Sequence, residues 1–399
     1  MTDRIATLMQ QNRRTTDGHS YTIPSPSSYP YQWFWDSCFH ALILRHLDVA
    51  AAKAELAALV ALQYEDGFIG HVSYWERQAV LDVDWHKERT SDLIQPPLLA
   101  YAVSQVYAVS EDHDWLQRIY PAVARYYEFL LRERDLRGLG LIGYVNPDES
   151  GEDNSPRFDT LFTLPPQHAV ETHLEKRYHL FSVHKDCALN AWCTSRTFWV
   201  EDTPLNAFLI WNLEHLAELA RACDDAAAAK RYRAAARRTA AAMREHMFAD
   251  GVFAPLLGLT GERTVEGTWA RFAPLVSQQY TKREAATLIE RDLLDEAKFW
   301  LPAGVPTVGK HDPAYDPVEP GWGEAWQHPH WRGPIWMNIH WFLYHGLCNY
   351  GYDALARELR DKSSSLLEQS GFREYYHPET GKGMGAQDFT WGALVIDMQ

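Results

Sequence analysis

Helical segments that come in pairs constrain the fold of this chain more than any other feature of its sequence. Apolar residues recur at helical spacing in consecutive segments that are separated by short turns. The expected helices lie at 37–64 (two helices), 93–110, 114–135, 205–224, 226–248, 277–294, 333–351, 352–371 and 388–399. Strand-like alternation is limited to short pieces such as GLIGYV and GVFAPL. The chain is therefore predicted to be all-α.

The arrangement of the pairs favours a closed structure over an open one. An α-solenoid would show a repeat of fixed length, whereas these pairs are unequal and their loops differ. The glycine signatures of nucleotide-binding α/β folds are absent. We expect an (α/α)6 barrel, or toroid, whose long loops form a pocket at one end. No linker-like tract divides the chain, so residues 1–399 are predicted to form a single domain.

Charge and cysteine content exclude several classes of protein. The 399 residues carry a formal net charge of −15, which argues against nucleic acid or an anionic membrane as a partner. No apolar run reaches the roughly 18 residues of a membrane helix, and the polar N-terminus does not resemble a signal peptide. The five cysteines are odd in number and show no CxxC spacing, which argues against a disulfide framework or structural zinc site. A cytoplasmic protein is expected.

Aromatic residues suggest the ligand. There are 16 Trp, 20 Tyr and 16 Phe, and they gather with polar and acidic residues in YPYQWFWD, VSYWERQ and PGWGEAWQHPHWRGPIW. Aromatic faces stack on the C–H faces of sugars, although core packing is the alternative for any single ring. The predicted partner is a small carbohydrate, with no cofactor. His328 and His330 lack a third ligand at helical spacing, so no metal is predicted. Oligomeric state, including a homo-oligomer, is left open.

Acidic residues on loops suggest the chemistry. ESGEDNSPRF holds Glu149, Glu152 and Asp153 among turn-forming residues, which indicates a solvated turn, a metal site or the acid half of a catalytic pair. A second acid, Glu374, lies among aromatics in GFREYYHPETG. Glycoside hydrolysis needs two such carboxyl groups, one to protonate the leaving oxygen and one to activate water or attack carbon. Asp36 fits either a sugar contact or a helix N-cap.

At these motifs the chain resembles glycoside hydrolase family 63, in the (α/α)6-barrel clan that also contains trehalases. The matching pieces are WFWDSCFHA, IQPPLLA, ESGEDNSPRFD, LNAFL, WRGPIWMN and REYYHPETGKGMGAQDFTW. The resemblance implies an inverting mechanism on an α-glycosidic bond, with Asp153 as general acid and Glu374 as general base. Such carboxyl groups stand roughly 6.5–9.5 Å apart. Glu149 and Glu152 would hold the loop or stay solvated, and nearby negative charge would raise the pKa of Asp153.

The resemblance also implies substrate contacts. The residues expected to line the sugar subsite are Trp33, Phe34, Asp36, Gln95, Asn206, Trp331, Gly333 and Trp336. The candidates for the leaving group are Tyr29, Arg157, Tyr375, Tyr376, His377 and Gln387. Gln95 also fits a helix cap. If the leaving group is glycerate, Arg157 is the expected partner of its carboxylate. His377 and Glu152 depart from the family's usual residues at their positions.

Three functions remain in competition at this point. The short chain resembles most the bacterial mannosylglycerate and glucosylglycerate hydrolases, which implies release of glucose or mannose from a small glycoside. An α-glucosidase acting on a disaccharide or short oligosaccharide is the second hypothesis. The third is a toroid that binds carbohydrate or protein without turnover. The sequence leaves glucose against mannose open, and Gly381, Gly383 and Gly385 suggest a mobile loop near Glu374.

Overall fold

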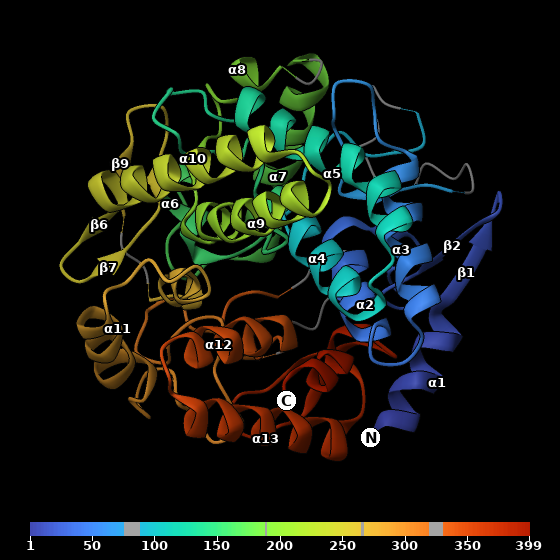
Figure 1. The fold of residues 1–399 in the computed structure, drawn as a ribbon. Helices are drawn as coiled ribbons and strands as arrows, with labels where there is room; N and C mark the ends of the chain where they lie inside the picture. The colour runs from blue at the N-terminus through green and yellow to red at the C-terminus, as the bar shows by residue number, and fades with distance from the viewer. Residues whose placement is uncertain (76–87, 188–189, 265–266, 319–329) are drawn as a thin grey trace.

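A computed structural model describes residues 1–75, 88–187, 190–264, 267–318 and 330–399 of the chain. Figure 1 shows helices following one another around the molecule, with short strands in the connections. The α-helices are α1 (Thr2–Asn12), α2 (Phe34–Leu44), α3 (Val49–Ala61), α4 (Leu99–Ser110), α5 (His113–Glu133), α6 (Asp159–Phe162), α7 (Val170–Cys187), α8 (Ala191–Thr194), α9 (Thr203–Ala222), α10 (Ala226–Ala242), α11 (Lys282–Leu288), α12 (Met337–Asn349) and α13 (Asp353–Ser370).

Short helices of other types complete this set. Within the described residues the 3-10 helices are η1 (Pro147–Ser150), η2 (Pro156–Phe158), η4 (Trp269–Leu275) and η7 (Thr390–Asp397). The π-helical turns η3 (Met243–Met247) and η5 (Ile289–Leu293) continue α10 and α11.

Six elements close an inner ring. Around the ring, α2 packs on α4, α4 on α9, α9 on η4, η4 on α12, α12 on η7, and η7 again on α2. Every residue of α2 is buried, because the helix lies between neighbours on all sides. One hydrophobic core, which runs from Ile5 to Met398, fills this ring and the space around it. The predicted (α/α)6 toroid is confirmed.

An outer layer of helices covers the ring. The partners α3, α5, α10 and α13 pack against α2, α4, α9 and α12, and α1 packs against η7. Asp48, Asp112 and Asp225 accept hydrogen bonds from the first turns of α3, α5 and α10, so each of these outer helices begins at an aspartate cap. These caps explain why the helix pairs were readable in the sequence.

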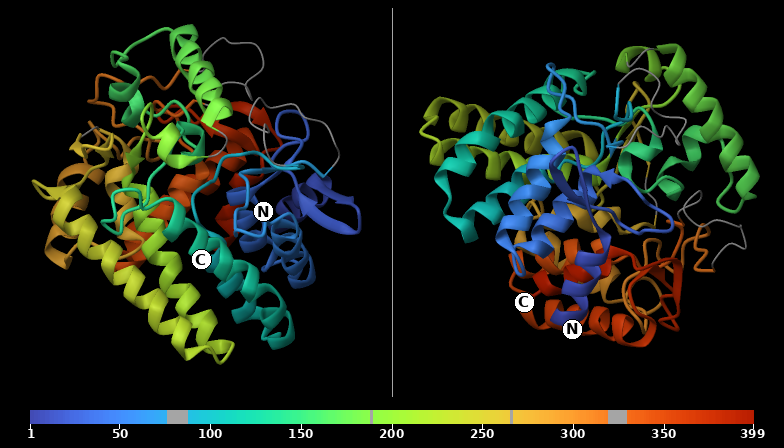
Figure 2. Two further views of the ribbon diagram at one scale, coloured as in Figure 1. Left: turned by 90° about the horizontal axis from the view of Figure 1, so that it is seen from above. Right: turned by 90° about the vertical axis from the view of Figure 1, so that its right-hand side faces the viewer.

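Three features differ from the helices expected. The inner element between α9 and α12 is the 3-10 helix η4, whose interior Pro274 disfavours an α-helix. The peripheral helix α7, green in Figure 2, was not predicted at all. Finally, α4 begins at Leu99, so Pro96 and Pro97 precede the helix instead of occupying its first turn.

Short antiparallel strands join the helices at the loops. Their bounds are β1 (Arg13–Thr16), β2 (His19–Thr22), β3 (Gln32–Trp33), β4 (Val72–Ser73), β5 (Val200–Glu201), β6 (Phe248–Ala249), β7 (Val252–Phe253), β8 (Leu256–Leu257), β9 (Glu262–Arg263), β10 (Arg373–Tyr376) and β11 (Gly383–Gln387). The pairs are β1–β2, β3–β4, β6–β7 and β10–β11, and β8 lies between β5 and β9. The hairpin β10–β11 carries Glu374.

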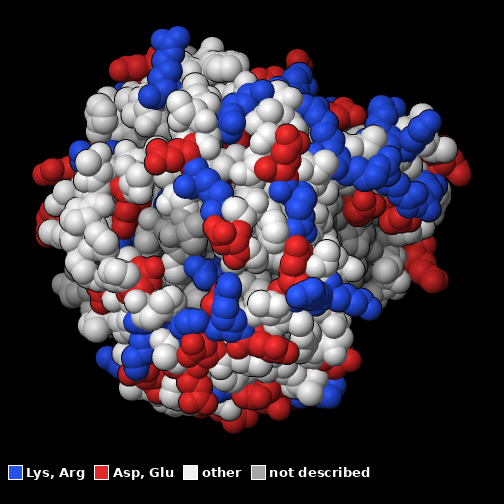
Figure 3. Space-filling model, turned by 90° about the vertical axis from the view of Figure 1, so that its left-hand side faces the viewer, with Lys and Arg blue, Asp and Glu red and all other residues white. Residues whose placement is uncertain are grey.

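The surface carries both signs of charge. In Figure 3 acidic and basic side chains are interspersed over one face, and Lys and Arg gather toward its upper right. The net charge of −15 is therefore not concentrated on this face. Across the described residues, no helix combines the length and the apolar character required to cross a bilayer.

Candidate active site

The acid loop, residues 146–159, is held by a buried ion pair. Glu149 is fully buried, and its two oxygens accept hydrogen bonds from Arg134 Nη1 and Nη2 at 2.7 and 2.6 Å. The same carboxylate accepts the backbone N–H groups of Ile94 and Val145. Glu149 is thus an internal anchor that joins the loop to two neighbouring segments.

A second carboxylate of the loop is bound in the same manner. Glu152 Oε2 accepts from Arg157 Nη1 at 2.7 Å and from Trp269 Nε1 at 3.0 Å. Arg157 also donates to both oxygens of Asp202 at 3.2 Å, and its side chain is completely buried. The expectation that Arg157 contacts the leaving group does not fit this position, because its donors are directed at two internal carboxylates.

Asp153 has a different environment. Its Oδ2 atom lies 3.4 Å from Arg177 Nη2, and 15% of its side chain is exposed. Arg177, on α7, is held mainly by Asp148, with Nε to Oδ1 and Oδ2 at 2.9 and 3.0 Å and Nη2 to Oδ2 at 2.5 Å. The cation beside Asp153 is therefore shared with, and closer to, another acid.

This environment favours the protonated form of Asp153. Burial and, next, the negative charge of Asp148 raise the pKa of Asp153 to about 8, against the lowering effect of the Arg177 cation. Glu152 adds a weaker raising effect. A carboxyl group with such a pKa carries a proton at neutral pH and can donate it to a leaving oxygen.

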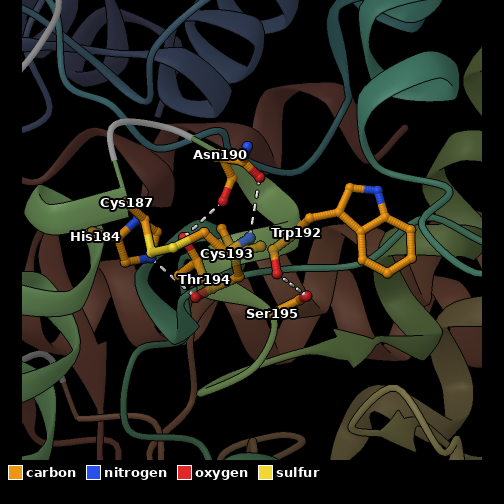
Figure 4. The surroundings of a disulfide bond; sticks show 8 residues. His184, Cys187, Asn190, Trp192, Cys193, Thr194 and Ser195 are labelled. Atoms are coloured by element: carbon orange, nitrogen blue, oxygen red, sulfur yellow. Dashed lines mark hydrogen bonds between the residues drawn. A yellow bond between two sulfur atoms is a disulfide. The ribbon is translucent and has the colours of Figure 1, made fainter.

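Helix α7 is anchored at several points beside the acid loop. Apart from Arg177, His184 Nε2 donates to Val145 O at 3.0 Å. A disulfide joins Cys187, the last residue of α7, to Cys193 of α8, as Figure 4 shows beside His184. Cysteine number and spacing argued against a disulfide framework, but these two residues, whose Cα atoms lie 5.6 Å apart, form one disulfide. Among the described residues Cys38, Cys223 and Cys348 are free thiols.

Glu374 lies on strand β10 of the hairpin β10–β11. Glu374 is fully buried, and its Oε2 atom accepts the N–H of Ala386 at 2.7 Å. The strand pairing shifts register between Arg373 and Tyr375, so β11 bulges opposite Glu374. Gly385 occupies this bulge with φ +65°, and a Cβ atom there would lie 2.5 Å from Glu374 Oε2. Glycine is thus required for the backbone to approach the carboxylate.

Tyr29 connects the two carboxyl groups. Its hydroxyl donates to Glu374 Oε1 at 2.6 Å. Burial raises the pKa of Tyr29 first, and the charges of Glu374 and, more weakly, Asp153 raise it further. The charges of both acids thus act on one half-buried phenol. That Asp153 and Glu374 work as an acid and base pair stays a prediction.

Tryptophans form one wall of this region. Trp331 and Trp336 stack with ring centroids 3.8 Å apart and an angle of 7°, and Tyr375 packs on Trp336 at 5.1 Å. Trp33 meets Tyr29 edge-on at 5.7 Å. The indole N–H groups of Trp33 and Trp331 are buried and have no hydrogen-bond partner in the described part of the chain. Buried donors without partners are typical of a site that awaits a polar ligand.

A family model decides the assignment. The model for the "Mannosylglycerate hydrolase MGH1-like glycoside hydrolase domain" matches residues 29–392. The chain belongs to this family. It is a glycoside hydrolase, and the matched span contains both Asp153 and Glu374.

Three relatives of this glycoside hydrolase illustrate the match. The mannosylglycerate hydrolase of Rubrobacter radiotolerans is 29% identical, over 99% of this chain and 97% of its own. The glucosylglycerate hydrolase of Mycolicibacterium hassiacum is 26% identical, over 98% and 96%. A crystal structure of the family 63 mannosylglycerate hydrolase from Thermus thermophilus with Tris and D-glycerate superposes with a TM-score of 0.86 at 27% identity, over 100% and 98% of the two chains.

Two residues expected to contact the sugar, Asp36 and Gln95, have partners at or near the start of helix α2. Asp36 is the third residue of α2, not its N-cap, and its Oδ1 atom accepts Trp391 Nε1 at 2.5 Å. Burial raises the pKa of Asp36 to about 6. Gln95 Oε1 accepts the N–H of Trp35 at 3.0 Å, so this side chain caps the first turn of α2, not that of α4.

Three other residues expected to contact the sugar have partners inside the protein instead. Phe34 is completely buried against Tyr126. Asn206 hydrogen-bonds to both backbone groups of Ile142 and to Asp202 O. Gly333 has φ +148° and approaches the backbone of residues 316 and 317, which leaves no room for a side chain. Packing or backbone hydrogen bonds already occupy Phe34, Asn206 and Gly333. They therefore support the site and are not free to contact a sugar.

The residues of the hairpin that were predicted to contact the leaving group differ in their surroundings. The hydroxyl of Tyr376 donates to Gly371 O at 2.7 Å, and His377 Nδ1 accepts the N–H of Glu379 at 3.2 Å. Gln387 is exposed at the end of β11. Of this group only Tyr375 packs against the tryptophan wall.

Sequence reasoning missed Asp148 and Arg177. Asp148 directly precedes Glu149 in an acidic run, and this adjacency was the available signal. Arg177 gave no signal, since its helix lies far along the chain and was not predicted. His328, Trp322 and Trp326 lie outside the described residues. Within those residues, no group of three or more His, Cys, Asp or Glu side chains is arranged to hold a metal ion.

Proposed function

We propose that this glycoside hydrolase releases glucose or mannose from glucosylglycerate or mannosylglycerate with inversion of configuration. The observations that carry the proposal are the raised pKa of Asp153 beside Asp148 and Arg177 and the hydrogen bond from the Tyr29 hydroxyl to Glu374. Relatives that match nearly the whole chain carry the names mannosylglycerate hydrolase and glucosylglycerate hydrolase, which supports the choice of substrate.

Asp153 and Glu374 divide the reaction between them. Asp153 donates its proton to the glycosidic oxygen as the bond to the sugar breaks, and the glycerate hydroxyl leaves. Glu374 takes a proton from a water molecule that attacks the anomeric carbon from the opposite face. The Tyr29 O–H and the Ala386 N–H hold both oxygens of Glu374 and so orient the base.

Arg177 replaces Arg157 as the proposed partner of a glycerate carboxylate. It lies beside Asp153, and 20% of its side chain is exposed, whereas Arg157 is completely buried. A leaving group that receives a proton from Asp153 must lie next to this guanidinium. The positive charge of the guanidinium strengthens a hydrogen bond to a carboxylate, which suits this role.

The test is turnover of glucosylglycerate, mannosylglycerate, trehalose and kojibiose, with NMR detection of the anomer first released. We expect a β-anomer from a glycerate glycoside, and no turnover by Asp153→Ala or Glu374→Ala. Glu379→Gln, an exposed acid on the same hairpin, is the matched control. If only a disaccharide is cleaved, the α-glucosidase hypothesis is supported instead. Release of an α-anomer would overturn the inverting mechanism.

We further propose that residues 1–399 act as one catalytic domain, because one core joins Ile5 to Met398. We also propose that the enzyme works in the cytoplasm, and the Cys187–Cys193 disulfide is the observation that counts against this, because disulfides are rare there. Thiol titration of the denatured protein from a gently lysed cell tests the second point. Five thiols fit a cytoplasmic enzyme, whereas three mean that Cys187 and Cys193 were oxidised in the cell.

A further inference from the structure

The Arg177 guanidinium is shared unequally by two acids. It makes three contacts of 2.5–3.0 Å to Asp148 and one of 3.4 Å to Asp153. The Asp148 side chain is 6% exposed, and those of Arg177 and Asp153 are 20% and 15% exposed. One side of this group is internal and the other reaches solvent, so a ligand reaches Arg177 from the side of Asp153.

The two neighbours act on Asp153 in opposite directions. The charge of Asp148 favours the protonated carboxyl group, and the charge of Arg177 favours the carboxylate. Among the other titratable groups, Glu152 adds a smaller negative contribution. Tyr29 stays neutral because its pKa is raised, and burial followed by Arg177 lowers the pKa of His71 to about 3, so His71 is also uncharged. After burial, which has the largest effect, Asp148 and Arg177 therefore influence the proton affinity of Asp153 most.

We propose that Asp148 and Arg177 couple the charge of the leaving group to the protonation of Asp153. An anionic substrate that binds Arg177 then helps to keep Asp153 protonated as the general acid. This inference rests on the proposed function. Asp148 and Arg177 together carry no net charge, and a substrate carboxylate on Arg177 adds a negative charge beside Asp153. Asp153 then holds its proton more firmly in the complex than in the free enzyme. Asp148 is a positioning residue in this scheme, since it acts through Arg177 and through its charge.

A neutral leaving group gives the opposite result. It would leave the Arg177 cation without a new partner, so Asp153 would lose its proton at lower pH. Discrimination between anionic and neutral substrates would then appear in kcat at alkaline pH as well as in KM. The basic limb of the pH profile reports this, because the acid works only while protonated.

The experiment compares glucosylglycerate with the neutral glycoside in which a hydroxymethyl group replaces the carboxylate. For the wild type, we expect the basic limb of kcat to lie about one pH unit higher for the anionic substrate, as a new charge at this range implies. In kcat/KM, which reports the free enzyme, the two limbs should coincide. Coinciding limbs in kcat as well would overturn the proposal.

Variants separate charge from structure. Asp148→Asn should lower the basic limb of kcat/KM by about one pH unit, because it removes the charge that favours the proton. Asp148→Glu keeps the charge and should restore the limb. Arg177→Met should raise the limb and abolish the difference between the two substrates in kcat. Asp361→Asn, which removes one charge from an exposed pair, is the control.

The outcomes distinguish this inference from the proposed function. If glycerate glycosides are cleaved and Asp148→Asn leaves the limb unmoved, the inference fails and the function stands. If only neutral disaccharides are cleaved, the function fails, and the part of the proposal that concerns the substrate charge fails with it. Thermal melting of each variant at the assay pH values identifies a loss of activity that comes from unfolding, and the position of the limb is then read from the fraction that remains folded.

Discussion

The acid loop and the base hairpin hold their catalytic carboxyl groups in contrasting ways. In the acid loop, Asp153 lies near Asp148 and Glu152 and only 3.4 Å from a cation that another acid binds more closely. In the hairpin, Glu374 accepts hydrogen bonds from two neutral donors, the Tyr29 hydroxyl and the Ala386 N–H. One carboxyl group has acidic neighbours, and the other has hydrogen-bond donors.

The difference follows from the two tasks. A general acid must keep a proton at working pH, which burial and negative neighbours promote. A general base must accept a proton, and an ionised carboxylate is the form that accepts hydrogen bonds from O–H and N–H donors. The same functional group is thus directed to opposite roles by its surroundings, in the manner expected for paired carboxyl groups in glycosidases.

Replacement of the base gives the largest expected effect. Glu374→Gln keeps the shape of the side chain and removes its ability to take a proton, so kcat should fall about 10³-fold. Steady-state kinetics on a glycerate glycoside measure this, with Glu379→Gln as the control. A variant that keeps more than a tenth of the activity would show that another group is the base.

Loss of the loop anchor should cost the most stability. Glu149→Gln leaves the Arg134 cation buried without its charged partner, and the free energy of unfolding should fall by about 3–5 kcal/mol. Urea denaturation measures it. Glu133→Gln, in an exposed pair with Arg132, should change the value by less than about 0.5 kcal/mol. Equal effects of the two substitutions would contradict the anchoring role.

The raised pKa of Asp153 should also affect the stability of the protein, measured as the free energy of unfolding. The folded-state pKa of Asp153, about 8, lies above its ordinary value of 3.8, so the stability that its proton contributes is fully present below that ordinary value and is lost as pH rises through 8. Asp153→Asn removes this loss. Its free energy of unfolding should be close to that of the wild type at pH 4 and exceed it by about 6 kcal/mol at pH 9, because each of the roughly four pH units between the two pKa values contributes about 1.4 kcal/mol.

Denaturation series at pH 4, 6.5 and 9 measure the difference, and Asp361→Asn, at an exposed site, should show no such trend. A difference that does not grow with pH would mean that the pKa of Asp153 is not raised in the folded protein, and the contrast between the two regions would be lost.

The smallest expected effect separates two roles for Tyr29. Tyr29→Phe removes the hydrogen bond to Glu374 and should lower kcat about tenfold, the amount that a loss of about 1.4 kcal/mol implies. If Tyr29 binds the leaving group instead, KM should rise with kcat unchanged. Tyr107→Phe, which removes a hydroxyl from α4, is the control.

Local patterns account for the parts of the fold that were predicted. Apolar spacing marked α3, α5 and α10, and the structure adds an aspartate cap at the start of each. The inner element η4 and the peripheral α7 were missed. Pro274 breaks the helical pattern of the first, and the second has a weak contrast between its faces. The Cys187–Cys193 disulfide was missed as well, since cysteine spacing cannot show that a turn brings two thiols together.

The sequence by itself determined the helical class and the closed toroid, and its motifs proposed the two acids, because short-range spacing and motif identity carry that information. Only the tertiary structure decided what each polar side chain does. Arg157 and Arg177 look alike in the sequence, yet one is enclosed by Glu152 and Asp202 and the other reaches solvent beside Asp153. Burial and partners arise from segments distant along the chain, and they set both the proton affinity of an acid and the reach of a cation.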